Sequence, residues 1–514
     1  MFTNNAQKQQ KQRQPQWKRR RFKLINIILF IIQKFVNDTV FIFIANIVRL
    51  VPNFIIRKSS VLFFTRGYGD FTVVKTIRKN LIDGVTKKSL PPMKIRWDPF
   101  KEVEEWDINL IDNSTTDKKQ KIARLEMESG TFQTQDVAKT CSKSRYLKNL
   151  MNGEVRRVSN TNSSKTKRVA ILLPFTGDQD YFFRVKVAEE LIANSPDCVC
   201  LIPELPFYGS RNSAFQSSHV LNTVSDYTLM QLIVAREMCG LIEWTKLEYG
   251  DGVSIVIGGF SMGAYIATLS GILASLNFHD ENKSSNSKLG VVSMCGWHNF
   301  ENLSRASFIR LRADKKQLQV ADSSLQNYIF DILVSSESDN SSQSGSPDER
   351  RARKAKKLFS TVDATVAAVQ RNGDSSNGNS KQSKSNESNE RGENIFKNLS
   401  WLAIVCRTLQ KLLGVEMFVN ACGGEASFAN RLDAMVFHFA KRDKLIAAGD
   451  QMDLIKKRCI DCTKPGGAIF TYDKRDHLAN AYDVKGVWIP SFLQAFECME
   501  NSKPSTTSSR KKKK

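Results

Sequence analysis

The sequence predicts an α/β fold in which a doubly wound, mostly parallel sheet is covered by helices on both faces. Two observations favour this fold. From about residue 168, short continuous apolar runs alternate with longer segments of helical periodicity, as is typical of parallel strands buried between helices. In addition, the apolar run 254–260 leads through a serine flanked by glycines into a second apolar segment, which indicates a tight strand-to-helix turn.

The expected elements follow one another in a regular order. Strands are expected at RVAILLPF, CVCLIPELP, VSIVIGGF and LGVVSMCG, and the helices between them at DYFFRVKVAEELIA, DYTLMQLIVAREMCGLIEWTKLEYG and MGAYIATLSGILASL. Ser225 is expected to cap the second of these helices, and Gly250 to end it. Near the end of the chain, AMVFHFAKRD and GAIFTYDKRDH predict two more strands, and VKGVWIPSFLQAFECME predicts a closing helix.

The alternation is interrupted once, so we expect one α/β domain over residues 56–500 with an insertion at 298–430. Within the insertion, residues 334–395 are rich in Ser, Asn, Gly, Lys and Arg. Such a composition buries too little apolar surface to offset the entropy of ordering, so this part is expected to be disordered. The segment FKNLSWLAIVCRTLQKLLGVEMFVN, which follows it, restores a helical pattern.

Basic arms flank the predicted domain. Residues 1–55 and 501–514 contribute to the formal net charge of +24; the first 37 residues contain no Asp or Glu, and the last segment ends in SSRKKKK. Basic blocks of this kind favour anionic surfaces. No zinc-finger spacing, basic zipper or aromatic-basic RNA-binding stretch is present in the sequence, so an anionic membrane surface is expected as a partner and specific nucleic acid is not.

The apolar part of the first arm leaves three interpretations open. Lys34 and Asp38 interrupt it, so neither apolar block reaches the roughly 20 residues of a spanning helix. Residues 24–51 could form a tilted or interfacial membrane helix, a mitochondrial-type presequence, or a helix packed on the domain. The acid-free start favours the mitochondrion, and the terminal lysines, which resemble a dilysine retrieval signal, make the endoplasmic reticulum the alternative.

The ten cysteines of the chain do not predict a metal site. Cys459 and Cys462 have CxxC spacing, but no second pair or nearby histidine accompanies them, which argues against zinc. We expect ordinary reduced thiols, and neither a cofactor nor a metal.

Ser261 is the expected nucleophile. It stands at the centre of a G-x-S-x-G pattern whose glycines are Gly259 and Gly263. The pattern alone is weak, but here it lies between a buried strand and a helix, the context that lifts a serine hydroxyl above the sheet. The glycines are expected because strand and helix approach too closely there for side chains.

His477 is the expected base, since a serine hydroxyl needs a neighbouring base to take its proton. In this architecture the chain order is serine, acid, histidine. Of the five histidines, His477 alone follows the last strand, at its carboxyl end, where such sheets place their active sites. His438 lies inside an expected strand and is better explained as a core histidine. The others precede the serine or any plausible acid: His219, His279 and His298.

Asp443 is the expected acid. It follows the expected strand in AMVFHFAKRD, and the next expected strand, in GAIFTYDKRDH, leads to His477. An acid at this place would hold the imidazole in one tautomer. The carboxylates that remain as weaker alternatives lie near it in the sequence or near the histidine: Asp433, Asp450, Asp453, Asp473 and Asp476.

An oxyanion hole in this architecture combines two backbone N–H groups. One belongs to the residue after the nucleophile, which is Met262. The other belongs to the loop after an early strand, LLPFTGDQD, where Thr176 is the expected donor and Gly177 lets the backbone turn.

Several segments together resemble the alpha/beta-hydrolase domain-containing protein 18 family within the α/β-hydrolase superfamily. They are FFTRGYGD (63–70), TGDQDYFFR (176–184), PFYGSR (206–211), TVSD (223–226), GGFSMGAYIATL, KRDKLIA and DHLANAY. The resemblance covers roughly 61–310 and 430–498. It implies the α/β-hydrolase fold, supports Ser261, Asp443 and His477 as the triad, and implies a serine hydrolase of acyl esters. A lipid is then the expected substrate, with deacylation of a cardiolipin-like mitochondrial phospholipid the leading idea. The alternative is a catalytically silent hydrolase-fold scaffold tethered to a membrane; the oligomeric state is left open.

Overall fold

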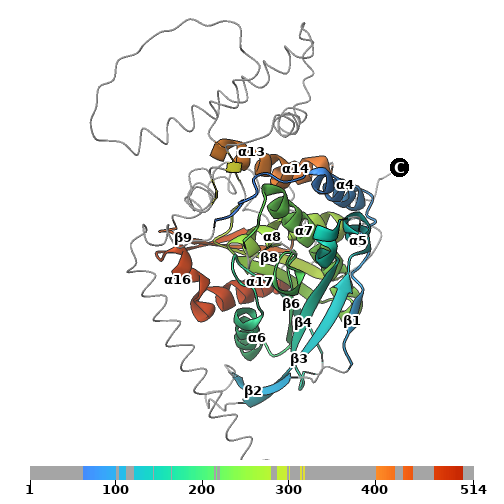
Figure 1. Ribbon diagram of the computed structural model, residues 1–514. Helices are drawn as coiled ribbons and strands as arrows, with labels where there is room; N and C mark the ends of the chain where they lie inside the picture. Colours follow the sequence, from blue (N-terminus) through green and yellow to red (C-terminus); the bar gives the residue numbers. More distant parts are fainter. Residues whose placement is uncertain are drawn as a thin grey trace, which may run out of the picture. The chain divides into compact units, whose positions relative to one another are not determined.

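The computed structural model divides the chain into two units, Met1–Val61 and Leu62–Lys514, and the described residues all belong to the second (Figure 1). They are 62–99, 104–110, 121–142, 144–163, 165–213, 216, 220–278, 286–297, 300, 313–314, 317–318, 401–422, 432–443 and 468–501. The predictions about the first arm, about residues 334–395, about the Cys459–Cys462 pair and about nearly all of the last arm therefore lie outside the described residues.

The described strands form one ten-stranded sheet with the order β1-β3-β4-β6-β5-β7-β8-β9-β10, and β2 pairs with β3 beside this path. The strands are β1 (Ile95–Trp97), β2 (Glu104–Leu110), β3 (Lys121–Gln133), β4 (Asn152–Asn160), β5 (Arg168–Leu173), β6 (Cys198–Pro203), β7 (Ser254–Phe260), β8 (Lys288–Met294), β9 (Ala434–Ala440) and β10 (Ala468–Asp473).

The predicted parallel sheet is confirmed for the six strands from β5 to β10, which pair with one another in parallel. In this register Leu173 lies opposite Gly259, and Phe260 lies opposite Met294, so the carboxyl ends of β5, β7 and β8 meet at one edge. The chain leaves β5 for β6 on one side and then crosses to β7 on the other. Such a reversal of strand order opens a crevice at the carboxyl ends.

The antiparallel strands β1–β4 extend the sheet on the other side and are an addition to the predicted architecture. Their burial is one-sided: in β4 the side chains of Val155 and Val158 are buried, whereas Arg156 and Arg157 are half-buried. Antiparallel sheets often face solvent on one side, which leaves them without the continuous apolar runs of buried strands.

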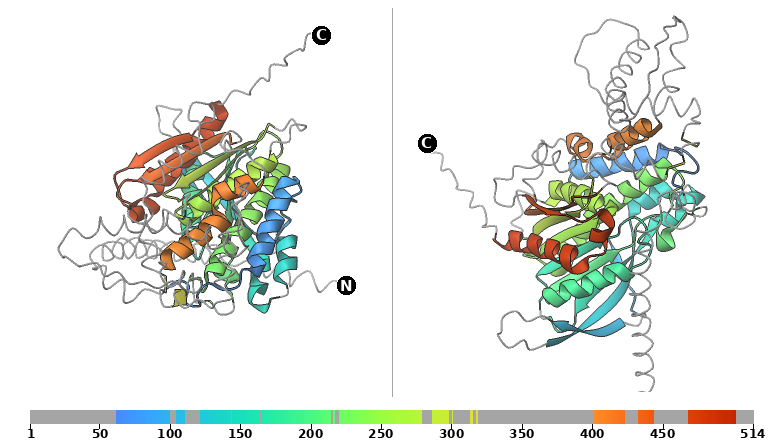
Figure 2. Two further views of the ribbon diagram at one scale, coloured as in Figure 1. Left: turned by 90° about the horizontal axis from the view of Figure 1, so that it is seen from above. Right: turned by 90° about the vertical axis from the view of Figure 1, so that its left-hand side faces the viewer.

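Helices cover both faces of the sheet (Figures 1 and 2). Helices α6 and α17 pack on one face, and α8 packs on the other beneath α7, α4 and α13. The helices are α4 (Thr72–Thr86), α5 (Gln135–Cys141), α6 (Phe182–Asn194), α7 (Val224–Tyr249), α8 (Met262–Phe278), α13 (Trp401–Leu413), α14 (Val415–Ala421), α16 (His477–Ala481) and α17 (Ile489–Asn501), with shorter 3-10 turns η1 (Arg145–Met151) and η2 (Gly209–Arg211) and a π-helical turn η5 (Val484–Trp488). In this part of the chain, no helix is both long enough and apolar enough to cross a bilayer.

The start of α7 corrects one expectation. The cap is Thr223, and Ser225 lies buried in the first turn. The Thr223 hydroxyl accepts from the N–H of Asp226 at 3.0 Å, and the Asp226 carboxylate accepts from the N–H of Thr223 at 3.1 Å. This reciprocal capping box satisfies two N–H groups, which a cap at Ser225 would not do. The expected end at Gly250 is confirmed, with φ +78°.

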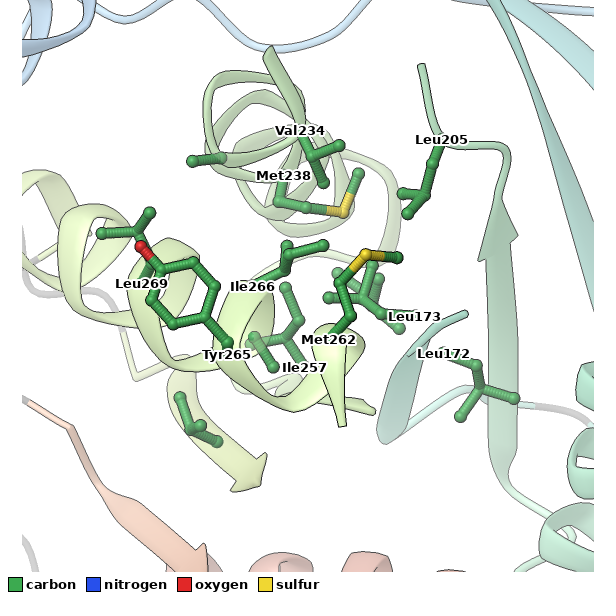
Figure 3. Packing of buried hydrophobic residues seen from close by; sticks show 14 of the residues in the cluster. Leu172, Leu173, Leu205, Val234, Met238, Ile257, Met262, Tyr265, Ile266 and Leu269 are labelled. Atoms are coloured by element: carbon green, nitrogen blue, oxygen red, sulfur yellow. The ribbon is translucent and has the colours of Figure 1, made fainter. Parts of the chain in front are cut away.

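The core beneath the carboxyl edge is built from β5, β7, α7 and α8 (Figure 3). These elements contribute buried side chains that meet under the start of α8: Leu173, Val234, Met238, Ile257, Met262, Ile266 and Leu269. Close packing of this kind fixes the positions of the strand ends, and with them the loops that follow.

Candidate active site

Ser261 occupies a strained turn between β7 and α8. Its φ is +54°, a region that residues other than glycine rarely adopt and that often marks a functional site. The turn is held on both sides: the Ser261 N–H donates to the carbonyl of Met294 at 2.8 Å, and the Ser261 carbonyl accepts from the N–H of Ala264 at 3.1 Å. The serine therefore stands where the sequence pattern predicted it, at the carboxyl end of a central strand.

The two glycines around the serine lie where no side chain fits. A Cβ on Gly259 would come within 2.7 Å of the Gly263 carbonyl carbon, and a Cβ on Gly263 would come within 2.6 Å of the Pro174 oxygen. The close approach expected between strand and helix is therefore present. It also places the chain just after β5 against the start of α8.

His477 is the first residue of the short helix α16, which follows β10. Its Nε2 lies 3.0 Å from Ser261 Oγ. The ring packs edge-on against Phe260, with the centroids 4.8 Å apart. Asp476 caps the helix by accepting from the N–H of Ala479 at 2.8 Å, so the backbone that carries the histidine is anchored. The sequence indicated a loop here, and the short helix was missed.

Asp443 completes the constellation from the turn after β9. Its Oδ2 lies 2.5 Å from His477 Nδ1, and its side chain is fully buried. A carboxylate at this nitrogen selects the tautomer whose Nε2 can accept the serine proton. The structure thus brings together the three side chains that the sequence singled out, although they are far apart along the chain.

The described alternatives for the acid have other partners. Asp473 pairs with Arg475, Asp476 caps α16, and the Asp433 carboxylate accepts from the N–H of Leu289. Asp450 and Asp453 lie outside the described residues. Among the described carboxylates, Asp443 is the one that contacts the His477 ring.

His438 is the core histidine expected from its position in a strand. It is buried in β9, and its Nδ1 lies 2.8 Å from the Thr471 hydroxyl. Burial lowers its pKa, because the apolar interior disfavours the charged imidazolium. The other three histidines, at positions 219, 279 and 298, lie outside the described residues.

The two expected oxyanion donors flank the elbow. Met262 is the first residue of α8, so its N–H belongs to the helix turn whose donors have no acceptor within the helix. Thr176 lies in a turn in which the Asp178 N–H donates to the carbonyl of Phe175 at 3.1 Å. Gly177, in the same turn, has a φ of +96°. The contact between Gly263 and Pro174 brings this turn next to the elbow.

Cys295 is a further residue at the site, which the sequence reasoning did not single out. It follows β8 with φ +50°, and its thiol lies within 4.8 Å of the Asp443 carboxylate and the His477 ring. Burial, together with the nearby carboxylate, raises the pKa of this thiol. Within this group, Asp443 Oδ2 and His477 Nδ1 lie at a hydrogen-bond distance of 2.5 Å from each other. No sequence pattern signals such a position, because its environment arises from tertiary packing.

An aromatic cluster borders the serine on the side of α6. The Phe175 ring meets those of Phe183, Phe260 and Tyr482 edge-on, at centroid distances of 5.5, 6.5 and 5.8 Å. Phe260 is buried, whereas Tyr482 is 39% exposed. The cluster therefore runs from beside His477 to the surface. Its members come from three separate segments, so the sequence alone did not group them.

The site and the sheet together define the class of the protein. A nucleophile elbow after a central parallel strand, followed in chain order by an acid and a histidine after later strands, is the arrangement of the α/β-hydrolase fold. Residues 61–299 match the family described as alpha/beta hydrolase domain containing 18, so the resemblance to this family is confirmed over that segment. The matched residues include the elbow, while Asp443 and His477 lie beyond them.

Two of the solved structures to which the chain is similar are each named as an acetyl xylan esterase. The chain is similar to acetyl xylan esterase 1 from Thermoanaerobacterium sp. JW/SL YS485, with 8% identity and a TM-score of 0.39, covering 88% of this chain and 98% of that one. It is also similar to acetyl xylan esterase from Paenibacillus sp. R4, with 9% identity, a TM-score of 0.36 and coverage of 88% and 99%. Likeness at this level does not bear on the substrate.

Proposed function

We propose that the protein is a serine hydrolase that cleaves acyl esters through an acyl-enzyme. The observation that carries this proposal is the continuous chain of hydrogen-bond distances from Ser261 Oγ to His477 Nε2 at 3.0 Å and from His477 Nδ1 to Asp443 at 2.5 Å. A nucleophile, a base and a group that orients the base, all within hydrogen-bonding reach, are the arrangement that activates a hydroxyl.

The first half of the proposed reaction transfers the acyl group to the serine. Ser261 Oγ attacks the ester carbonyl carbon while His477 Nε2 takes the hydroxyl proton, and Asp443 stabilises the imidazolium that forms. The negative charge that develops on the carbonyl oxygen is accommodated by the N–H groups of Met262 and Thr176. Collapse of this intermediate breaks the ester bond, and His477 returns the proton to the leaving alcohol.

The second half releases the acid. A water molecule gives a proton to His477 and attacks the acyl-enzyme, and the resulting intermediate expels Ser261 Oγ, which regains its proton from His477. The complete cycle consumes one water and one ester and yields an alcohol and a carboxylic acid. Every step uses side chains or backbone groups of this chain.

A lipid acyl ester is the proposed substrate class, with a cardiolipin-like phospholipid as the leading candidate. The resemblance to the family supports this choice, and so do the basic arms, which favour anionic lipid surfaces. The partly exposed aromatic cluster at Phe175 and Tyr482 offers apolar surface beside the nucleophile. Comparison of the lipids of cells that carry wild-type protein with those of cells that carry Ser261→Ala tests the substrate: accumulation of an intact phospholipid in the variant is expected, and an unchanged lipid profile would contradict it.

Labelling by a fluorophosphonate probe tests the chemistry. The wild-type chain should be labelled and Ser261→Ala should not, whereas Ser254→Ala should be labelled like the wild type, because Ser254 begins the same strand at its opposite end. Equal labelling of Ser261→Ala would refute the catalytic assignment. Labelling of the wild type without hydrolysis of any ester would favour the silent scaffold.

Recruitment to membranes is a separate proposal. We expect the full chain to pellet with anionic vesicles in a salt-sensitive manner, equally for wild type and Ser261→Ala, and to locate to mitochondria, with the endoplasmic reticulum as the alternative. Nucleic-acid duplex that outcompetes the vesicles would contradict this. Imaging of the chain with and without residues 1–55 tests the location.

A further inference from the structure

Two of the sequence segments that resemble the family, TGDQDYFFR and PFYGSR, contain no member of the proposed triad, yet they meet next to it. The first contains the turn with Thr176, and the second follows β6. A Cβ on Gly209, in the second segment, would lie 3.4 Å from the Gln179 carbonyl oxygen in the first. The two segments therefore form one structural unit at the carboxyl edge of β5 and β6.

A buried ion pair holds the end of the turn. The Arg184 Nε donates to Asp178 Oδ2 at 2.8 Å, and the two side chains are only 3% and 2% exposed. The same guanidinium donates from its other two nitrogens to the carbonyls of Pro203 and Asp180, both at 2.7 Å. One planar group thus ties the turn to the start of α6 and to the end of β6, which a lysine could not do.

Burying this charge pair is costly, which calls for an explanation. Burial raises the pKa of the Asp178 carboxyl to about 6, and the neighbouring Arg184 opposes that rise. Apolar residues often serve stability as well as a buried ion pair does. What the pair provides here is a fixed geometry at three points, the Asp178 carboxylate and the carbonyls of Asp180 and Pro203. Asp178 ends the turn that contains Thr176.

Tyr208 supports the same turn from the second segment. The Gly177 N–H donates to the Tyr208 hydroxyl at 3.4 Å, and the tyrosine is buried. Its own backbone is fixed, because the Tyr208 N–H donates to the carbonyl of Leu205 and the Tyr208 carbonyl accepts from the N–H of Arg211. Phe207 before it adopts a φ of +64°, a conformation that persists only when the surroundings impose it.

We propose that Arg184 and Tyr208 are positioning residues that hold the turn Phe175–Asp178, so that the Thr176 N–H points at the developing oxyanion. This inference rests on the proposed function, since it assigns a role in that reaction. Neither side chain touches the reacting atoms in the proposed mechanism. Both act through the backbone of the turn, and displacement of one oxyanion donor is expected to lower kcat while KM changes little.

Paired variants of the full chain test the proposal. Arg184→Lys keeps the charge but loses the three-point contact. Its control is Arg168→Lys, the same substitution at the amino end of β5. Tyr208→Phe removes the hydroxyl near Gly177, and its control is Tyr146→Phe, which removes a hydroxyl that donates to Asp226 at 2.8 Å. Two experiments are made on each variant: kcat and KM are determined for p-nitrophenyl acetate, and hydrogen exchange of the backbone amides is followed in residues 174–181.

We expect kcat to fall by about 10- to 100-fold in Arg184→Lys, and less in Tyr208→Phe, with faster exchange of residues 174–181 in both and no such change in either control. Unchanged exchange in Arg184→Lys would overturn the proposal, as would faster exchange with an unchanged kcat. If the wild-type protein hydrolyses no ester and Ser261→Ala does not differ from it, the proposed function fails, and the exchange of residues 174–181 still decides whether Arg184 and Tyr208 hold the turn.

Discussion

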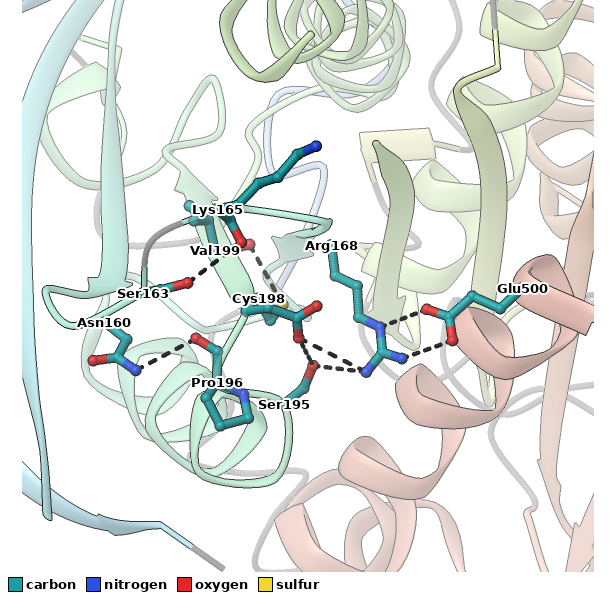
Figure 4. A network of polar contacts seen from close by, with 10 residues as sticks. Asn160, Ser163, Lys165, Arg168, Ser195, Pro196, Cys198, Val199 and Glu500 are labelled. Carbon is teal, nitrogen blue, oxygen red and sulfur yellow. Dashed lines mark hydrogen bonds and ion pairs between the residues drawn. The ribbon is translucent and has the colours of Figure 1, made fainter. Parts of the chain in front are cut away.

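The two ends of the central parallel strands carry charge in different ways. At the amino end of β5, Arg168 binds Glu500 of α17 through two hydrogen bonds of 2.7 and 2.8 Å, and Glu500 is 43% exposed (Figure 4). Beyond the carboxyl end of the same strand, Asp178 and Arg184 form a pair that is almost entirely buried. The first pair ties two elements together at the surface, whereas the second fixes a loop beside the nucleophile.

Backbone strain follows the same division. Among the described residues, five that are not glycine have positive φ, and three of these lie after β6, β7 and β8: Phe207, Ser261 and Cys295. No such residue lies in the turns that lead into the amino ends of these strands among the described positions. Strained conformations and buried charges persist where the surrounding structure imposes them, and their concentration at one edge of the sheet supports the proposal that the active site lies there.

The largest effect is expected when the proposed nucleophile at the carboxyl edge of the sheet is removed. Ser261→Ala should lower kcat for p-nitrophenyl acetate by about 10⁴- to 10⁶-fold, because the attacking hydroxyl is removed, while urea unfolding stays close to that of the wild type. Ser254→Ala, at the amino end of the same strand, should retain activity. An active Ser261→Ala protein would show that the edge has no such role.

A smaller loss is expected for the acid. Asp443→Asn keeps the shape of the side chain but lets an amide face His477 Nδ1, which favours the wrong imidazole tautomer. We expect kcat to fall by about 10⁴-fold, with KM little changed, as measured on the same ester. Activity within a few-fold of the wild type would indicate that another carboxylate orients the histidine.

The difference between buried and exposed ion pairs gives a stability prediction. Glu237 is fully buried and pairs with the equally buried Arg211 at 2.7 Å, so Glu237→Ala should lower the free energy of unfolding by about 3–5 kcal/mol. Glu500→Ala, at the exposed pair, should lower it by about 0–1 kcal/mol. Urea titrations of the two variants provide the comparison, and equal losses would contradict it.

The smallest expected effect concerns pH and His438. Burial lowers the pKa of this imidazole in the folded chain, so between the folded value and the ordinary value of 6.5 the unfolded chain binds the proton and the folded chain does not. Stability from this site is therefore complete above pH 6.5 and declines as the pH falls below it. Urea midpoints at pH 7 and pH 5 should differ less in His438→Gln than in the wild type; an unchanged difference would exclude His438 as the cause.

The sequence was sufficient for the parallel half of the fold because both faces of those strands are buried. Apart from Ser254 and Arg168, VSIVIGGF and RVAILL are apolar, so the strands and their positions can be predicted from the sequence. The chain order of serine, acid and histidine then selected Ser261, Asp443 and His477 from the residues of each type. Asp443 and His477 could be chosen because each follows a strand whose carboxyl end reaches the same edge as Ser261.

The antiparallel half and the supports of the site could not be predicted in the same way. Strand β2 has the sequence EEWDINL. Its charged residues make the segment resemble a loop, because a strand covered on only one face lacks a continuous apolar run. At the start of α7, Thr223 and Ser225 are both good caps, and only the partner of Asp226 decides between them. Arg184 belongs to an expected helix, but its burial against Asp178 depends on how β6 and α6 pack.

The most direct test of the account is to find which atom carries the acyl group. The full chain is mixed with p-nitrophenyl acetate and quenched in acid within one turnover, and its peptides are analysed by mass spectrometry. The account predicts one acetyl group on Ser261, which is absent when the chain carries His477→Ala. An acetyl group on the neighbouring Cys295 instead of Ser261 would contradict it.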